Sequence, residues 1–70
     1  MNKNQMEEIE LGIKNGVDVT IYAKKEFNSW QMYIIRLGLE KGLDVSKYLD
    51  KDLPWINMAL VKAELEAKLT

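Results

Sequence analysis

A repeat of 26 residues is the feature that most constrains how this chain can fold. When the sequence is shifted by 26 positions, residues 2–27 fall on residues 28–53 with eleven identities. The identical pairs are Asn2/Asn28, Gln5/Gln31, Met6/Met32, Ile9/Ile35, Leu11/Leu37, Gly12/Gly38, Gly16/Gly42, Asp18/Asp44, Val19/Val45, Tyr22/Tyr48 and Lys25/Lys51. A third copy starts at Leu53 and keeps the first part of the pattern. A period of this length is typical of stacked helical units, so we predict one helical unit used repeatedly.

Each unit carries start and stop signals for a long helix followed by a short one. Asn28 is a good N-cap residue, and Gln31 three residues later completes a capping box. Gly42 ends the helical pattern and is expected to adopt a positive φ just beyond the helix. Asp44 then suits the N-cap of a short helix that holds Tyr48. The same residues recur 26 positions earlier, which predicts the same local structure twice.

Apolar residues at helical spacing predict the core. This stripe comprises Met6, Ile9 and Ile13 in the first long helix, Met32, Ile35 and Leu39 in the second, and Met58, Val61, Leu65 and Leu69 in the third. The second helix has another apolar face, with Tyr33, Ile34 and Leu37, where the first has Glu7 and Glu8. Inner units of a repeat stack bury two faces and outer units bury one. We therefore predict a central second helix, with Ile34 and Leu37 largely buried and both glutamates exposed.

Two glycines stand inside predicted helices, where glycine costs about 1 kcal/mol relative to alanine. Such a cost at Gly12 and Gly38 indicates that another segment approaches the backbone closely. The third copy has Glu64 at this position, which predicts a terminal capping helix with nothing packed there. The repeated residues Tyr22 and Tyr48 are expected to pack their rings and keep their hydroxyls at the surface.

The residue inventory excludes several kinds of chemistry. The 70 residues include no Cys and no His, which excludes disulfides, thiolate metal sites and histidine-based catalysis. The aspartates near predicted turns fit capping roles, and they are Asp18, Asp44, Asp50 and Asp52. We therefore predict no enzymatic activity, no cofactor and no metal.

Charge and hydropathy bear on partners and location. Ten basic and 11 acidic residues nearly cancel, which disfavours nucleic acid as the partner. No apolar run approaches the roughly 18 residues of a membrane span, and the N-terminus is followed by no apolar signal segment. We expect a cytoplasmic protein that does not bind membranes.

One stretch resembles a known family. The pattern Q-M-x-x-I-x-x-G-L-x-x-G-L-D-V-S-x-Y, from Gln31 to Tyr48, resembles a degenerate tandem helical repeat of Firmicutes and other gut-bacterial phage and mobile-element proteins. The resemblance covers nearly the whole chain. That family usually has Trp three residues before the Met; Trp55 fits, whereas Ser29 holds this place in the second unit and Trp30 is displaced by one. The resemblance implies a fold and a genomic neighbourhood, and it assigns no functional residue.

These observations predict an all-α fold, a small helical-repeat stack of three main helices joined by short helical turns. We expect a single domain over residues 1–70. Its repeat units span residues 1–26 and 27–52, and a terminal capping helix spans residues 53–70.

Protein binding is the function that the sequence favours. The third helix has a second apolar strip, Leu60, Ala63 and Ala67, and Trp30 is a further candidate contact residue. Alanine is also simply a good helix former, so the strip has a structural explanation too. The leading hypothesis is a non-enzymatic protein-interaction module, such as a phage or mobile-element inhibitor or adaptor on a larger bacterial complex. The alternatives are a small nucleic-acid-binding regulator and a self-associating repeat fragment with a structural role.

Overall fold

The chain folds into helices joined by short helical turns. The computed structural model describes residues 1–69 and contains the helices α1 (Lys3–Lys14), α2 (Ser29–Glu40) and α3 (Trp55–Ala67). Two 3-10 turns, η1 (Val19–Ile21) and η2 (Val45–Lys47), lie between them. There is no strand in the described range. The predicted all-α fold of three main helices is confirmed.

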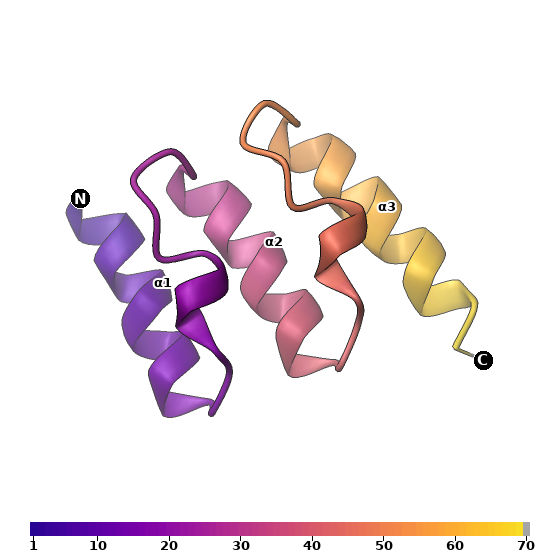
Figure 1. Ribbon diagram of the computed structural model, residues 1–70, viewed down its shortest axis with the longest axis horizontal. Coiled ribbons are helices and arrows are strands. Elements are labelled where there is room, and N and C mark those ends of the chain that lie inside the picture. The colour runs from indigo at the N-terminus through magenta and orange to yellow at the C-terminus, as the bar shows by residue number, and fades with distance from the viewer. Residues whose placement is uncertain (70) are drawn as a thin grey trace.

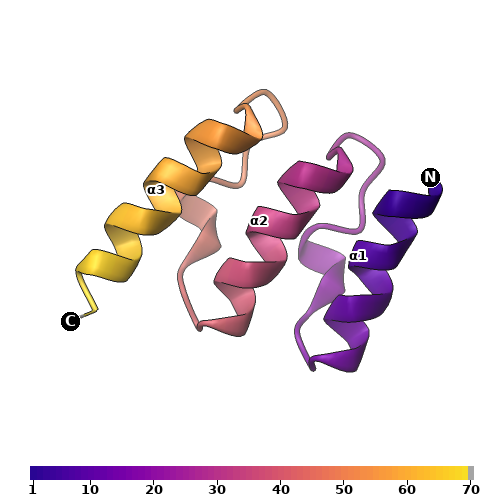
Figure 2. The same ribbon diagram turned by 180° about the vertical axis from the view of Figure 1, so that it is seen from behind.

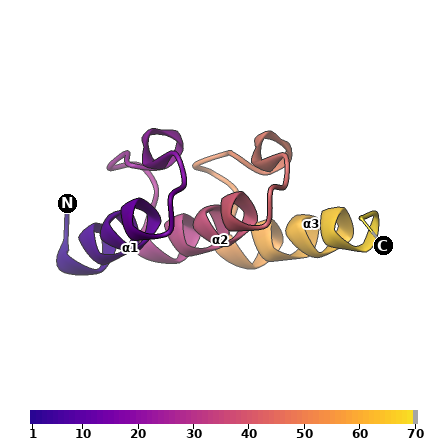
Figure 3. The same ribbon diagram turned by 90° about the horizontal axis from the view of Figure 1, so that it is seen from below.

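The three helices form one layer and the turns form another. They lie side by side in chain order and run in the same direction, with α2 between its neighbours as predicted (Figure 1). The segments with η1 and η2 cross one face of this layer (Figure 3). Seen from behind, the helices stand in front of these segments (Figure 2). One broad face is therefore built from the helices alone.

The predicted helix starts are present. Asn2 and Gln5 form a capping box at α1, with two reciprocal hydrogen bonds of 2.8 Å. Asn28 and Gln31 form the same box at α2, at 2.8 and 2.9 Å. These bonds satisfy backbone N–H groups that have no partner within the helix.

The predicted stops are present too. Gly16 and Gly42 have φ values of 77° and 72°, the left-handed region that glycine enters without steric cost. At the end of α2, the N–H of Leu43 donates to the carbonyl of Gly38 at 2.9 Å, and the N–H of Gly42 donates to Leu39 at 3.1 Å. This pair of bonds is a Schellman motif, which turns the chain back across the helix layer.

The glutamine of each capping box also joins its helix to the next one. The side-chain amide of Gln5 donates to the carbonyl of Phe27 at 2.7 Å. The amide of Gln31 donates to the carbonyl of Leu53 at 2.9 Å. Both acceptors lie just before the following helix, so one side chain caps a helix and sets the spacing to its neighbour.

A buried tyrosine holds each 3-10 turn against a helix glycine. A Cβ built on Gly12 would lie 2.0 Å from the Tyr22 hydroxyl, and one on Gly38 would lie 1.9 Å from the Tyr48 hydroxyl. The predicted close approach is confirmed. The prediction of surface hydroxyls is wrong, because Tyr22 donates to the carbonyl of Glu8 at 2.6 Å and Tyr48 to that of Ile34 at 3.4 Å. Burial raises the pKa of both tyrosines to about 12.

Burial of the apolar stripes differs among the helices. Met32, Ile35 and Met58 are fully buried, as predicted. The first-helix stripe is correct only for Ile9, which packs against the core, and wrong for Met6 and Ile13, which are 51% and 63% exposed. They lie on the side of α1 opposite Glu8, which pairs with α2, and α2 is the helix that α1 contacts in the described chain. At the end of the chain Leu69 is also exposed rather than part of the core.

The second face of the middle helix is partly as predicted. Ile34 is buried, whereas Leu37 is only half-buried. Glu7 is exposed, but the Glu8 side chain is only 16% exposed because it pairs with Arg36 of α2. Within residues 1–69, no helix has the length and apolar character needed to cross a membrane.

Candidate functional site

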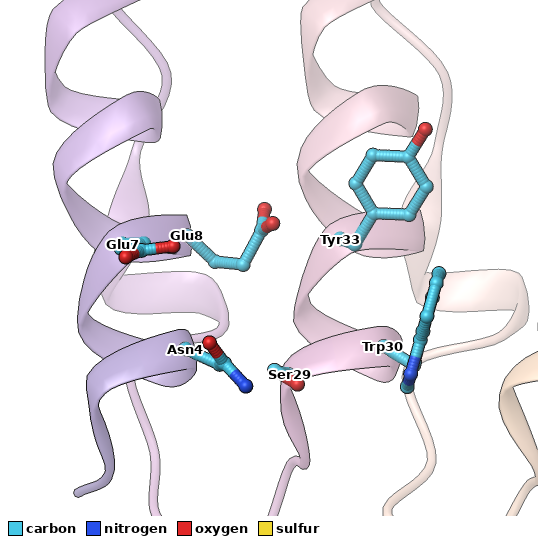
Figure 4. A pocket seen from close by; sticks show the side chains of 6 residues that line it. All are labelled: Asn4, Glu7, Glu8, Ser29, Trp30 and Tyr33. Carbon is cyan, nitrogen blue, oxygen red and sulfur yellow. The ribbon is translucent and has the colours of Figure 1, made fainter.

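A surface hollow lies between the first halves of α1 and α2. It has a volume of about 440 Å³. The residues that line it are Asn4, Glu7 and Glu8 of α1 and Ser29, Trp30 and Tyr33 of α2. Glu8 points toward α2, whereas the Trp30 ring lies on the side of α2 away from α1 (Figure 4). We call this hollow the aromatic groove. Tyr33 lies about 140° around α2 from Gly38, which faces η2, so the groove opens on the face built from helices alone.

Three aromatic rings form one wall of this surface. Trp30 is 56% exposed and stacks on Trp55 of α3, with ring centroids 5.0 Å apart and an interplanar angle of 23°. Tyr33 meets Trp30 edge-on, at 6.1 Å and 86°. The spacing of three residues brings Trp30 and Tyr33 to the same side of α2, and Trp55 is the first residue of α3. The exposed indole is therefore held by rings on two helices.

A buried arginine supports the groove from beneath. The guanidinium carbon of Arg36 lies 5.5 Å from the centre of the Tyr33 ring. Its Nε donates to Glu8 at 2.8 Å and its Nη1 to Glu40 at 2.7 Å, while the Asn15 amide donates to Glu40 at 2.8 Å. The hydrogen bonds from Asn15 and Arg36 hold the pKa of Glu40 below its usual range. This network joins α1 to α2 and fixes the Tyr33 ring by a cation–π contact.

The charge around the groove is negative. Two carboxylates, Glu8 and Glu40, share the single guanidinium of Arg36, which leaves one negative charge on this cluster. Glu7 adds another exposed carboxylate at the rim. A cationic group is therefore favoured in the groove, whereas a phosphate is repelled.

The structure places the predicted contact residues on two separate surfaces. Trp30 lines the aromatic groove. Leu60 is 61% exposed, and Ala63 and Ala67 are exposed along the same side of α3. Leu60 lies about 140° around α3 from Trp55, on the side turned away from α2. The strip Leu60–Ala63–Ala67 therefore does not share a surface with Trp30, and its role in binding stays a prediction.

Sequence reasoning missed the residues that surround Trp30. Tyr33 was assigned to an apolar face and Arg36 received no role. A local signal was available for part of the cluster, because Arg36 and Glu40 are four residues apart on one helix. The contact of Arg36 with Glu8 joins residues 28 positions apart, and no spacing rule predicts such a pair.

Three of the four aspartates near turns accept backbone hydrogen bonds as expected, whereas the Asp52 carboxylate pairs with Lys51. The Asp18 and Asp44 carboxylates accept hydrogen bonds from the backbone N–H groups of Thr20 and Ser46, at 3.1 and 3.2 Å. Asp50 accepts one from the N–H of Asp52 at 2.9 Å. Over residues 1–69, no group of three or more acidic side chains is arranged to hold a metal ion, and every buried side-chain N or O atom has a hydrogen-bond partner.

No family model, no curated protein and no solved structure matches this chain. Its function is therefore inferred from its own residues.

Proposed function

We propose that the chain is a protein-interaction module that binds a partner segment in the aromatic groove. The observation that carries this proposal is the exposure of Trp30, whose ring is stacked on Trp55 and bounded by Tyr33. Exposing an indole to water costs free energy that binding can recover. Trp and Tyr are also among the residues that contribute most to protein–protein affinity.

The groove is held in shape before any partner arrives. Trp30 is fixed by two rings, and Arg36 supports Tyr33 while pairing with carboxylates from two helices. A rigid surface loses little side-chain entropy on binding, so more of the contact energy appears as affinity. The same rigidity favours one binding geometry over many.

Charge and ring chemistry define the partner. Glu7 at the rim and the Glu8–Arg36–Glu40 cluster make the groove acidic. The exposed indole face attracts a cation as well as an apolar group. The proposed ligand is a protein segment with a Lys or Arg beside an apolar residue, with the cation toward Glu7 and the apolar group against Trp30.

Selection from a library of random linear peptides on the immobilised protein tests this proposal. The expected peptides carry Lys or Arg next to an apolar residue. Trp30→Ala is expected to weaken their binding by about 30-fold, the loss that corresponds to a contact worth about 2 kcal/mol. Glu7→Gln is expected to weaken the basic peptides while leaving the fold unchanged, because Glu7 is exposed.

Lys47→Ala is the matched control, because Lys47 is exposed in η2 on the other layer. The Lys47→Ala variant is expected to bind the selected peptides with the same affinity as the unaltered protein. The proposal is overturned if the library yields no binders, or if the selected peptides bind Trp30→Ala as well as the unaltered protein. Salt-sensitive binding of single-stranded DNA at the groove would point instead to a nucleic-acid regulator.

A further inference from the structure

Half of the exposed large apolar side chains lie on the outer sides of the two outer helices. Of the eight such residues in the described range, Met6 and Ile13 belong to α1, and Ile56 and Leu60 belong to α3. A small domain that leaves this much apolar surface at two opposite ends gains stability by covering it.

On α1, the exposed apolar residues Met6 and Ile13 point away from α2. Glu8 pairs with Arg36 of α2, which identifies the side of α1 that faces its neighbour. Successive residues of a helix are 100° apart, so Met6 and Ile13 lie about 160° and 140° around α1 from Glu8. We call Met6, Ile13 and the half-buried Ile9, which also packs against the core, the α1 end face.

On α3, the exposed apolar residues Ile56 and Leu60 also point away from α2. Trp55 stacks on Trp30 of α2, which identifies the inner side of α3. Leu60 lies about 140° around the helix from Trp55, and Ile56 is one turn before Leu60 on the same side. We call Ile56, Leu60 and Ala63 the α3 end face.

The two end faces correspond to the two sides of the middle helix. Met32 lies one turn before Arg36, on the side of α2 that packs against α1, and it is fully buried. Met6 occupies the corresponding position of α1, 26 residues earlier. Ile34 lies one turn after Trp30 on the α3 side of α2 and is buried; Leu60 occupies the position 26 residues later. Each end thus carries one half of a contact that the chain already makes internally.

We propose that copies of this chain dock head-to-tail, with the α3 end face of one copy packed on the α1 end face of the next. The contact repeats the packing of α1 on α2 and of α2 on α3. It joins two different surfaces, so every complex keeps one free α1 end face and one free α3 end face. The expected product is an open chain of copies rather than a closed dimer.

A polar pair at the same junction supports this geometry. The amides of Gln5 and Gln31 donate to the main-chain carbonyls of Phe27 and Leu53, just before the following helix. Asn57 occupies the corresponding position in α3 and is exposed. Met1 precedes α1 as Phe27 precedes α2, so the docked geometry places the Asn57 amide opposite the Met1 carbonyl of the next copy. The asparagine is one methylene shorter than the two glutamines, so this bond requires a slightly closer approach of the two copies.

The charges at the junction permit docking without driving it. Two ion pairs join neighbouring helices within the chain, Glu8–Arg36 and Lys41–Glu66. At the junction between copies, Leu60 and Glu10 of the next copy occupy the positions of the first pair, and Ala67 and Lys14 of the next copy occupy those of the second. No like charges are opposed, and no ion pair is formed. Association is therefore expected to rest on apolar burial and to depend only weakly on salt.

Two complementary variants test the proposal by sedimentation. Leu60→Asp disables the α3 end face and keeps the α1 end face, whereas Met6→Asp does the reverse. The unaltered protein is expected to show an average mass that rises with concentration beyond that of a dimer. Each variant alone is expected to stay monomeric, and an equimolar mixture is expected to reach twice the monomer mass and no more.

Matched controls keep this test independent of folding and of the proposed function. Circular dichroism checks the helix content; if either variant loses helix, Ala63→Glu and Ile13→Asp replace them. Lys47→Asp and Trp30→Ala are expected to associate as the unaltered protein does, because neither residue belongs to an end face. The proposal is overturned if the unaltered protein stays monomeric up to its solubility limit. It is also overturned if either folded variant associates alone, or if the mixture stays monomeric.

Discussion

Replacing Gly38 with Ala tests the packing that joins the two layers. In an open helix this change would stabilise the protein by about 1 kcal/mol, because alanine is the better helix former. Here the new Cβ would lie 1.9 Å from the Tyr48 hydroxyl and 2.9 Å from Cγ1 of Val45. Neither group has room to move outward, because Tyr48 and Val45 are both buried.

The expected loss of stability in Gly38→Ala is the sum of two costs and one gain. Overpacking a core typically costs about 1–3 kcal/mol. Displacing the Tyr48 hydroxyl from the Ile34 carbonyl costs about 1 kcal/mol more. The gain in helix propensity offsets about 1 kcal/mol of this total. We expect Gly38→Ala to lower the free energy of unfolding by about 2 kcal/mol, a large share of the roughly 4–10 kcal/mol typical for 70 residues.

Urea unfolding followed by circular dichroism measures this loss, and two further variants identify its cause. Tyr48→Phe removes the atom nearest to the new Cβ, so the double variant is expected to lose less stability than the two single variants combined. Glu64→Ala and Glu64→Gly measure the propensity difference at the corresponding exposed position of α3. If Gly38→Ala is as stable as the unaltered protein, or if the losses with Tyr48→Phe simply add, the tyrosine contact is not what requires glycine.

Three further predictions concern stability. Gly42→Val is expected to destabilise by more than about 1 kcal/mol in urea unfolding, because a β-branched residue is strained at a φ of 72°; an unchanged midpoint would contradict this. Ile34→Ala is expected to lower the free energy of unfolding by about 2–4 kcal/mol, and Leu37→Ala by less because Leu37 is half-buried. Leu60→Ala is expected to lower it far less at low protein concentration, because Leu60 is exposed. Equal losses in all three variants would contradict the burial pattern. Burial raises the pKa of Tyr22 and Tyr48 to about 12, so the free energy of unfolding is expected to stay constant up to pH 10 and to fall as the pH rises from 10 to 12. Phenolate absorbance is expected to show both tyrosines ionising above pH 10 in the folded protein. Ionisation of both at their ordinary pKa in the folded protein would contradict their burial.

The parts of the fold that were predicted correctly depend on residues close together in sequence. The capping box of Asn28 and Gln31 and the positive φ of Gly42 each follow from the chemistry of one helix end. The cost of glycine inside a helix predicted the close approach at Gly38, although not which group approaches. Local rules sufficed here because the interacting atoms belong to neighbouring residues.

The parts that were predicted wrongly depend on distant residues. The first-helix stripe has the correct spacing, but Met6 and Ile13 have no neighbouring helix in the described chain to bury them. Glu8 was expected to be exposed to solvent, but its side chain is mostly buried between α1 and α2 because it pairs with Arg36. Periodicity identifies an apolar side of a helix, but it does not state whether another element covers that side.

The candidate site was predictable only as a single residue. Trp30 was nominated as a contact residue, and it lines the groove. Its stacking on Trp55 joins residues 25 positions apart, and the Arg36 support beneath Tyr33 depends on a partner in α1. A groove is formed where two helices meet, so neither helix sequence alone predicts it.

Photo-cross-linking at position 4, which keeps Trp30 in place, tests the central claim most directly. A photoreactive amino acid replaces the exposed Asn4 of the groove in one variant and the exposed Lys47 in the other, and both are irradiated in cell lysate. We predict a discrete protein adduct from position 4 that a selected basic peptide suppresses, and no such adduct from position 47. The absence of an adduct at position 4, or the same adduct from both positions, would contradict a binding function for the aromatic groove.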